Sequence, residues 1–406
     1  MSVDTTGLPI PLRPLIAGRA LAFFGIILVA LNMRSAVASL SPLLGLIRHD
    51  LRIDGFTLAA LGMIPPLAYG VFGILAGRIA RAWGLERTLV VAVVALALGM
   101  FGRGIANGPT ELLAWSVLLF SGMGVGNVLL PPLVKKYFPD RIALMTTLYV
   151  SMFAVGNLIP PLVAVPLAEL SDWRLSVGIW GVGAVIALTP WLLILRNHRR
   201  DGTSSEFAHR PSTVKPWRSP MTWAILALFF CSGFNSYSLF AWMPQLLADQ
   251  GGVDAATSGA LLGLYSSVGL PLGLIVPLLV ARYRQVRLLV VAAFCLYAVG
   301  YGGLLYLPHL ALPLWVMLAG MGTLTFPATL VLINLRSRSH ATATATSSFV
   351  QGLGYTLVGL GVFIFGLLHT STHGWAVPLW FLLVTSSVLL PAAVVVGRHR
   401  YIEDGA

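Results

Sequence analysis

The sequence predicts an all-α membrane protein with twelve transmembrane helices in two pseudo-symmetric six-helix halves. First, 57% of the 406 residues are hydrophobic and only 10% are charged, whereas soluble domains carry about 25% charged residues. Second, mostly apolar runs of about 20 residues, long enough to cross a bilayer, recur along the chain. Third, short stretches of sequence in the first half recur in the second half. A disulfide scaffold is excluded because the two cysteines, Cys231 and Cys295, both lie in apolar runs.

Charged or Gly/Pro-rich breaks divide the apolar runs into twelve spans. The first six are expected at 18–47, 56–80, 87–107, 111–134, 142–168 and 174–195. The second six are expected at 221–247, 256–281, 287–307, 311–335, 341–368 and 375–397. A polar stretch at 197–220 separates the two sets, so the chain divides into an N-terminal half (1–196), a linker and a C-terminal half (221–406).

The Lys and Arg residues predict the orientation. Of the 26, 21 fall in termini and loops on one side, Arg48, Arg52, Arg103 and Arg174 fall on the other, and Arg34 lies within a span. The positive-inside rule then places both termini in the cytoplasm, with the spans in the inner membrane. Because basic residues are spread between spans rather than gathered in one patch, the net charge of +12 does not indicate nucleic-acid binding.

A cleaved signal peptide is the competing interpretation of the N-terminus, with its cleavage site near Ala38. Cleavage would leave eleven spans and would remove the partner of span seven, so this interpretation is disfavoured.

The halves align at a nearly constant offset. Residues 73–91 match 273–291, pairing Gly73 with Gly273 and Arg87 with Arg287, and 122–124 match 320–322. We therefore expect an internal duplication. Proline pairs interrupt spans two, four and five and are expected to kink them; these are Pro65–Pro66, Pro131–Pro132 and Pro160–Pro161.

The loop after span two resembles the signature loop of the major facilitator superfamily. Gly73, Arg78, Gly84 and Arg87 follow that signature, although Gly77 stands where the superfamily usually has Asp. The basic turn at 138–141, which ends in Arg141, is also similar. The resemblance implies two six-helix halves and assigns structural or gating roles to Gly73, Arg78, Arg87, Arg141 and Arg287.

Three shorter motifs resemble the cyanate / 2-nitroimidazole porter subfamily. They are Leu31-Asn32-Met33-Arg34, with Ser35 in place of the usual Pro, then residues 84–87, and Gly126-Asn127 with the sequence that follows to 139. The resemblance implies a small anion or nitro-bearing solute, such as cyanate, nitrate or nitrite, a nitroimidazole or a small carboxylate.

Arg34 is the residue that most needs an explanation. An arginine at the centre of a membrane helix costs about 2.5–3.5 kcal/mol, and it cannot lose its proton. Every Asp and Glu sits at or beyond a span end, so we expect a diffusible anion to be the counter-charge, held by the planar guanidinium. The alternative is that Arg34 binds backbone carbonyls freed near a proline and only packs the bundle.

Mid-span polar and aromatic residues complete the expected site. In this superfamily spans one, four, seven and ten line the cavity. We also include central residues of spans two, eight and eleven among the candidates. Asn32, about 200° around the helix from Arg34, is expected to brace a neighbouring helix, and Asn157 to be structural. Tyr69 and Tyr265 occupy corresponding places in spans two and eight. Each of these side chains could equally form a contact between helices as a contact with the substrate. The substrate-binding candidates are Arg34, Tyr69, Asn127, Asn235, Tyr237, Tyr265, Phe326, Gln351 and Tyr355.

The sequence thus predicts a monomeric transporter that works by alternating access, with a small-molecule substrate and the lipid bilayer as partners and without cofactor or metal. It contains no Walker, HExxH or Gly-x-Ser-x-Gly motif, so an enzyme is not expected. All eight histidines lie at span ends or in loops, which disfavours a proton relay. An anion crossing alone gains roughly 2.3 kcal/mol per 100 mV on export. A multidrug-type exporter of neutral organic compounds is the alternative.

Overall fold

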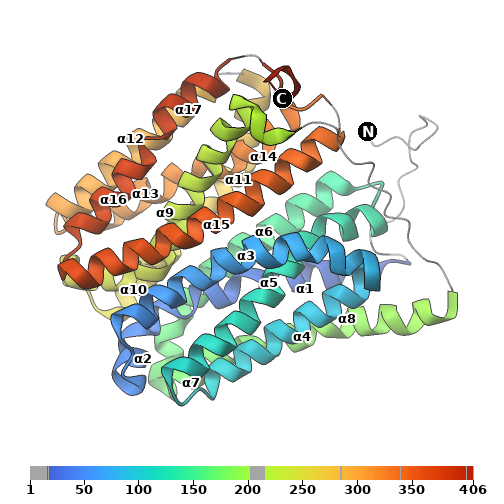
Figure 1. Cartoon of the computed structure of the whole chain (residues 1–406). Helices are drawn as coiled ribbons and strands as arrows, with labels where there is room; N and C mark the ends of the chain where they lie inside the picture. The colour runs from blue at the N-terminus through green and yellow to red at the C-terminus, as the bar shows by residue number, and fades with distance from the viewer. Residues whose placement is uncertain are drawn as a thin grey trace.

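The computed structural model describes residues 16, 18–201, 215–283, 286–338, 340–398 and 400–405. Within this part of the chain, twelve segments are helical, long and apolar enough to cross a membrane, which confirms the predicted fold class. They form one elongated bundle. The N-terminal half (blue to green) lies beside the C-terminal half (yellow to red) in Figure 1.

Six spans make up the N-terminal half. They are α1 (Ala20–Ala38) joined through η1 (Ser41–Leu43) to α2 (Leu44–Leu51), then α3 (Gly55–Trp83), α4 (Leu85–Gly104), α5 (Pro109–Tyr137), α6 (Ile142–Leu170), and α7 (Trp173–Gly178) continued by α8 (Trp180–Asp201). The boundaries fall within four residues of the predicted ones, except that α8 continues into the predicted linker. Linker residues 202–214 lie outside the described residues.

The C-terminal half follows the short turn η2 (Pro216–Arg218). Its spans are α9 (Pro220–Gly251), α10 (Ala255–Ser267) with α11 (Gly269–Tyr283), α12 (Val286–Tyr306), α13 (Leu312–Met321) with η3 (Gly322–Leu324) and α14 (Thr325–Leu335), α15 (His340–Thr372), and α16 (Ala376–Ser386) with α17 (Leu389–Val396). The turn η4 (Ile402–Gly405) comes last.

The proline pairs do not interrupt their helices. Pro65–Pro66, Pro131–Pro132 and Pro160–Pro161 lie inside the continuous helices α3, α5 and α6, which corrects the expectation of interrupted spans. Each proline removes a backbone hydrogen bond from its helix. This loss is tolerated because the helix is packed against its neighbours. The spans divide instead at other places, such as the turn between α1 and α2 and the junction at Val268.

The helix starts show the internal duplication. The Asp54 carboxylate accepts a hydrogen bond from the Thr57 N–H at 2.8 Å and caps α3. Two hundred residues later, the Asp254 carboxylate accepts from the Thr257 N–H at 3.1 Å and caps α10. An N-terminal aspartate satisfies donors that a helix leaves unpaired. Spans two and eight therefore begin with the same device.

A second repeated contact joins the first and last spans of each half. The Trp173 indole donates to the Asp50 carboxylate at 3.0 Å, and the Trp375 indole donates to Asp249 at 2.9 Å. Both pairs connect the end of one span to the start of another within the same half. The duplicated sequence therefore folds into duplicated contacts.

A third repeated contact allows close packing of the third and fourth spans. A Cβ added to Gly102 would lie 2.0 Å from the Trp115 ring, and one added to Gly303 would lie 2.1 Å from the Trp315 ring. In each half a tryptophan therefore lies flat over a glycine, and no larger residue fits there.

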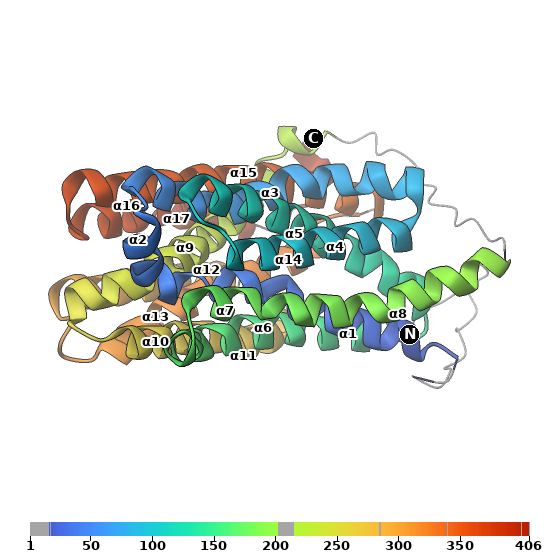
Figure 2. The same cartoon turned by 90° about the horizontal axis from the view of Figure 1, so that it is seen from below.

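The bundle has two distinguishable ends (Figures 1 and 2). We call the end that holds α2 and the starts of α3 and α10 the α2 end, and the opposite one the terminal end. At the α2 end the halves contact each other closely: a Cβ on Gly55 would lie 2.5 Å from Thr370 of α15, and one on Gly259 of α10 would lie 2.5 Å from the Pro161 carbonyl of α6.

Gly303→Ala should destabilise the protein by about 1–3 kcal/mol, because its methyl group would overlap the Trp315 ring. Gly302→Ala is the matched control, since no atom lies within 4 Å of its added Cβ. The midpoint of thermal unfolding of the purified protein should fall for the first variant and stay level or rise for the second. Equal midpoints would contradict this packing.

The Asp254 cap should make stability depend on pH. Hydrogen bonds from Thr257 lower the pKa of Asp254 below its usual value. The stabilisation is therefore complete above the unfolded pKa of about 3.9 and is lost as the pH falls through the lower folded pKa. Asp254→Ala should lower the unfolding midpoint at pH 7 and lower it progressively less below about pH 4. Asp254→Asn keeps the capping oxygen and should unfold close to the wild type at pH 7.

Candidate substrate site between the two halves

Arg34 projects from α1 of the N-terminal half to the interface with the C-terminal half. Its Nη1 donates a hydrogen bond to the Tyr237 hydroxyl of α9 at 3.0 Å. The residue is half-buried within the first membrane span. The charged group that the sequence singled out thus contacts the opposite half of the protein.

Aromatic rings from both halves surround the guanidinium group. Its central carbon lies 5.5 Å from the Tyr69 ring centroid and 5.2 Å from that of Phe153, distances at which a cation is attracted to a ring face. Tyr69 of α3 stacks on Tyr355 of α15 with centroids 5.3 Å apart. We call Tyr69, Phe153, Tyr237 and Tyr355 the aromatic box. Phe153 was not predicted, although it precedes Asn157 by one turn of the same helix.

No carboxylate balances Arg34 among the described residues. The ion pairs there lie near helix ends, for example Lys136 with Glu86 at 2.6 Å and Arg174 with Asp50 at 2.8 Å. Nor do three His, Cys, Asp or Glu side chains gather as a metal site in the same part of the chain. The box offers Arg34 a hydroxyl and ring faces but no opposite charge.

A second buried guanidinium belongs to Arg103, which the charge count places on the side opposite the termini. Arg103 is the penultimate residue of α4 and is 0% exposed. Its Nε donates to the Ser116 hydroxyl at 2.8 Å and its Nη1 donates to the Ala36 carbonyl at 3.1 Å. Its central carbon lies 4.8 Å from the Phe120 ring centroid. The sequence placed Arg103 correctly at a span end but could not show that its side chain turns inward.

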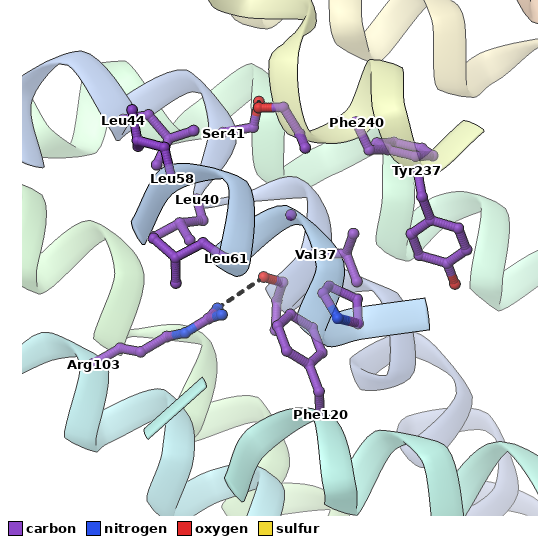
Figure 3. Close-up of a pocket in the computed structure, with 14 residues that line it drawn as sticks. Val37, Leu40, Ser41, Leu44, Leu58, Leu61, Arg103, Phe120, Tyr237 and Phe240 are labelled. Carbon is purple, nitrogen blue, oxygen red and sulfur yellow. Dashed lines mark hydrogen bonds between the residues drawn. The ribbon is translucent and has the colours of Figure 1, made fainter. Parts of the chain in front are cut away.

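A small cavity lies beside Arg103 (Figure 3). Its volume is about 30 Å³, and it is partly open to solvent. Arg103 and Phe120 line it, and so does Tyr237, the hydrogen-bond partner of Arg34. Residues of α1, η1, α2, α3 and α9 also line it, on the α2 side of Arg34. Both halves therefore contribute to one small cavity.

Asn235 lies apart from the aromatic box. It is 0% exposed and donates to the Cys231 carbonyl at 2.6 Å and to the Ser386 hydroxyl at 3.0 Å. Its side-chain oxygen accepts a hydrogen bond from the Tyr301 hydroxyl. These bonds join α9 to α12 and α16 inside the C-terminal half, so the amide has no free group directed at Arg34.

Tyr265 lies near the cavity rather than in the box. Its ring packs edge-on against Phe240, a lining residue, with centroids 5.7 Å apart. Tyr69 follows its helix cap by fifteen residues, whereas Tyr265 follows the equivalent cap by eleven. The two tyrosines are therefore about one helical turn apart in the repeat, and not at equivalent positions.

The described contacts of the remaining substrate-binding candidates are with other residues. Phe326 contacts Phe229 with centroids 5.8 Å apart, and Phe229 in turn packs edge-on against Tyr355. The Gln351 amide donates to the serine hydroxyl one turn earlier in α15 at 2.8 Å. Asn127 is half-buried on α5. Phe326 thus reaches the box through one intervening ring.

The residues expected to brace or gate the bundle lie in varied surroundings. Asn32 donates to the Leu28 carbonyl at 2.8 Å and lies against Gly183 of α8, which turns it away from Arg34. Asn157 is half-buried on α6, and Gly73 faces α5. Arg141 lies 3.7 Å from the Asp140 carboxylate. Three of the set are exposed: Arg78, Arg87 and Arg287.

Two packed six-helix halves with a polar site between them define a secondary transporter. The profile of the Major Facilitator Superfamily matches residues 22–359, and the chain belongs to that family. The predicted resemblance at superfamily level is thereby confirmed.

Curated relatives extend the comparison over nearly the whole chain. An uncharacterized transporter, YycB, of Bacillus subtilis is 33% identical and covers 93% of this chain and 94% of its own length. The 2-nitroimidazole transporter of Escherichia coli is 28% identical over 95% and 97% of the two chains. The cyanate transport protein CynX of the same organism is 27% identical over 85% and 89%. These similarities confirm the predicted resemblance to the cyanate / 2-nitroimidazole group and to transporters rather than enzymes.

A solved structure shows the same fold. The bacterial homologue of the human lysosomal transporter Spinster, in an inward-facing and occupied conformation, superimposes with a TM-score of 0.72. The identity is 15%, and the match covers 98% of this chain and 99% of that one.

Tyr237→Phe should destabilise the protein without ligand by about 1–2 kcal/mol, because it removes the hydroxyl that accepts from Arg34. Tyr265→Phe is the control, since the hydroxyl of Tyr265 is buried without a hydrogen-bond partner among the described residues. Thermal unfolding of both variants in the same detergent measures the difference. If Tyr237→Phe unfolds at the wild-type temperature, the contact between Arg34 and α9 contributes nothing to the stability of the protein.

Proposed function

We propose that this protein moves a small anion or a nitro-bearing polar solute across the cytoplasmic membrane by alternating access. The candidates are cyanate, nitrate- or nitrite-like ions, nitroimidazole-like compounds and small carboxylates. The substrate binds to Arg34 within the aromatic box, and both termini face the cytoplasm.

The observation that carries this proposal is the unbalanced charge of Arg34. The guanidinium remains protonated inside the membrane, yet its described partners are a hydroxyl and ring faces. Its planar fork matches a carboxylate, nitrate or nitro group with two parallel hydrogen bonds. Two relatives whose names specify cyanate, an anion, and 2-nitroimidazole, a nitro compound, support the same substrate class.

The box also limits substrate size and mode of binding. Tyr69 and Tyr355 stack closely, and Tyr237 approaches both rings, at 6.3 and 6.4 Å. A planar solute can lie against these faces while its oxygen atoms meet Arg34. Since the rings come from both halves, binding favours the state in which the halves are close together.

The membrane potential bears on the direction of transport. A monovalent anion that crosses alone gains roughly 2.3 kcal/mol per 100 mV when it leaves a cell that is negative inside. Net uptake therefore requires exchange for another solute or a sufficient inward gradient.

Arg34→Ala should abolish ligand-induced thermal stabilisation in a panel of cyanate, nitrate, nitrite, formate and 2-nitroimidazole. Arg34→Lys should retain only a weak response, because a point-like ammonium group cannot form the bidentate contact. Arg218→Ala removes the same charge from an exposed position outside the spans and should respond like the wild type.

An Arg34→Ala protein that responds to the same ligand as strongly as the wild type would overturn the role of Arg34. Stabilisation by neutral aromatic compounds instead, unchanged by Arg34→Ala, would favour the alternative exporter of neutral compounds, for which the aromatic walls would suffice.

A further inference from the structure

Arg103 carries a buried charged nitrogen that nothing in its surroundings explains. Its Nε and Nη1 are bonded to Ser116 and Ala36, but its Nη2 has no hydrogen-bond partner among the described residues. The side chain is 0% exposed, and a buried donor without a partner costs about 1–3 kcal/mol, more for a charged group. The described ion pairs do not include Arg103, so its charge also lacks a balancing carboxylate.

One packing role accounts for part of this arrangement. α1 ends at Ala38, and the last carbonyls of a helix lack partners within the helix. The bond from Nη1 to the Ala36 carbonyl satisfies one of them. This role requires one donor and leaves both the positive charge and Nη2 unexplained.

The second half shows that close packing of these two helices does not require an arginine. The matched Gly–Trp contacts align Gly102 with Gly303 and Trp115 with Trp315. The residue after the glycine is Arg103 in the first half and Leu304 in the second. The residue after the tryptophan is Ser116 in the first half and Val316 in the second. All four are fully buried. An apolar pair therefore fills the place that a charged pair fills in the first half.

The cavity places this charge near the substrate site. Arg103 borders it at one side, and Tyr237, which bonds Arg34, borders it at another (Figure 3). The remaining lining is mostly apolar, so a small anion that enters the cavity is attracted to the guanidinium group of Arg103. In a low-dielectric space such attraction is much stronger than in water.

We infer that Arg103 forms a second anion-binding position, on the α2 side of Arg34, through which the substrate passes between Arg34 and that end of the bundle. The anion binds Nη2 of Arg103 and passes between it and Arg34 by way of Tyr237, which lines the cavity and bonds Arg34. This inference rests on the proposed function and adds a second step to the path.

Cyanate flux and cyanate binding test this inference together. Full-length wild type, Arg103→Gln, Arg103→Lys and Arg34→Ala are compared by radiolabelled cyanate flux in proteoliposomes and by thermal-shift titration with cyanate. Arg103→Gln can still donate to the Ala36 carbonyl but carries no charge. Its flux should fall about tenfold or more, as expected for loss of one charge-assisted contact, while its dissociation constant for cyanate stays within about twofold. Arg103→Lys should recover part of the flux.

The double variant Arg103→Leu with Ser116→Val guards against a folding defect, because it copies the apolar pair of the second half. It should unfold near the wild-type temperature and lose flux as Arg103→Gln does. Wild-type flux in both neutral variants would overturn the second position. So would a loss of flux that Arg103→Lys does not restore and that parallels a lowered unfolding temperature, since that pattern describes a structural residue.

Arg34→Ala separates the two proposals. If this variant loses cyanate binding while Arg103→Gln keeps wild-type flux, only the second position fails. If Arg34→Ala binds cyanate like the wild type, the proposed function fails. If the wild type neither binds nor moves any of cyanate, nitrate, nitrite, formate and 2-nitroimidazole, both fail.

Discussion

The positive charge of Arg34 constrains the rest of the site. An arginine cannot escape burial by losing its proton, so the protein must supply polar groups wherever this side chain goes. It does so with the Tyr237 hydroxyl and with ring faces. Because Tyr237 belongs to the C-terminal half, separating the halves would withdraw this hydroxyl from Arg34. The solvation of one charge is therefore tied to the relative position of the two halves.

The packing contacts of the scaffold are repeated in the two halves, but the buried charge of Arg103 is not. Caps, Trp–Asp bonds and Gly–Trp contacts occur in both halves at nearly the same offset. The buried guanidinium of Arg103 has an apolar counterpart, Leu304. These repeated contacts hold helices together in both copies, whereas the buried charge of Arg103 occurs in the first half only.

The spans could be predicted because membrane burial requires long apolar runs, and those are visible in a single sequence. The same rule revealed Arg34, since a charge inside such a run is conspicuous. Side-chain direction is a property of three-dimensional packing and was not visible: Asn235, a candidate by position, is bonded inside its own half. Arg103 sits at a span end, where a basic residue normally faces water, so only the structure could show its inward orientation.

The charge of the occupied site follows from the proposed function. An empty site carries the full positive charge of Arg34 with no described carboxylate beside it, whereas a site that holds a monovalent anion is neutral. Moving an unbalanced charge between environments costs more than moving a neutral pair. Reorientation should therefore be easier for the loaded protein than for the empty one. A transporter that exchanges one anion for another never has to reorient empty, and the electrostatics of this site favour that mode.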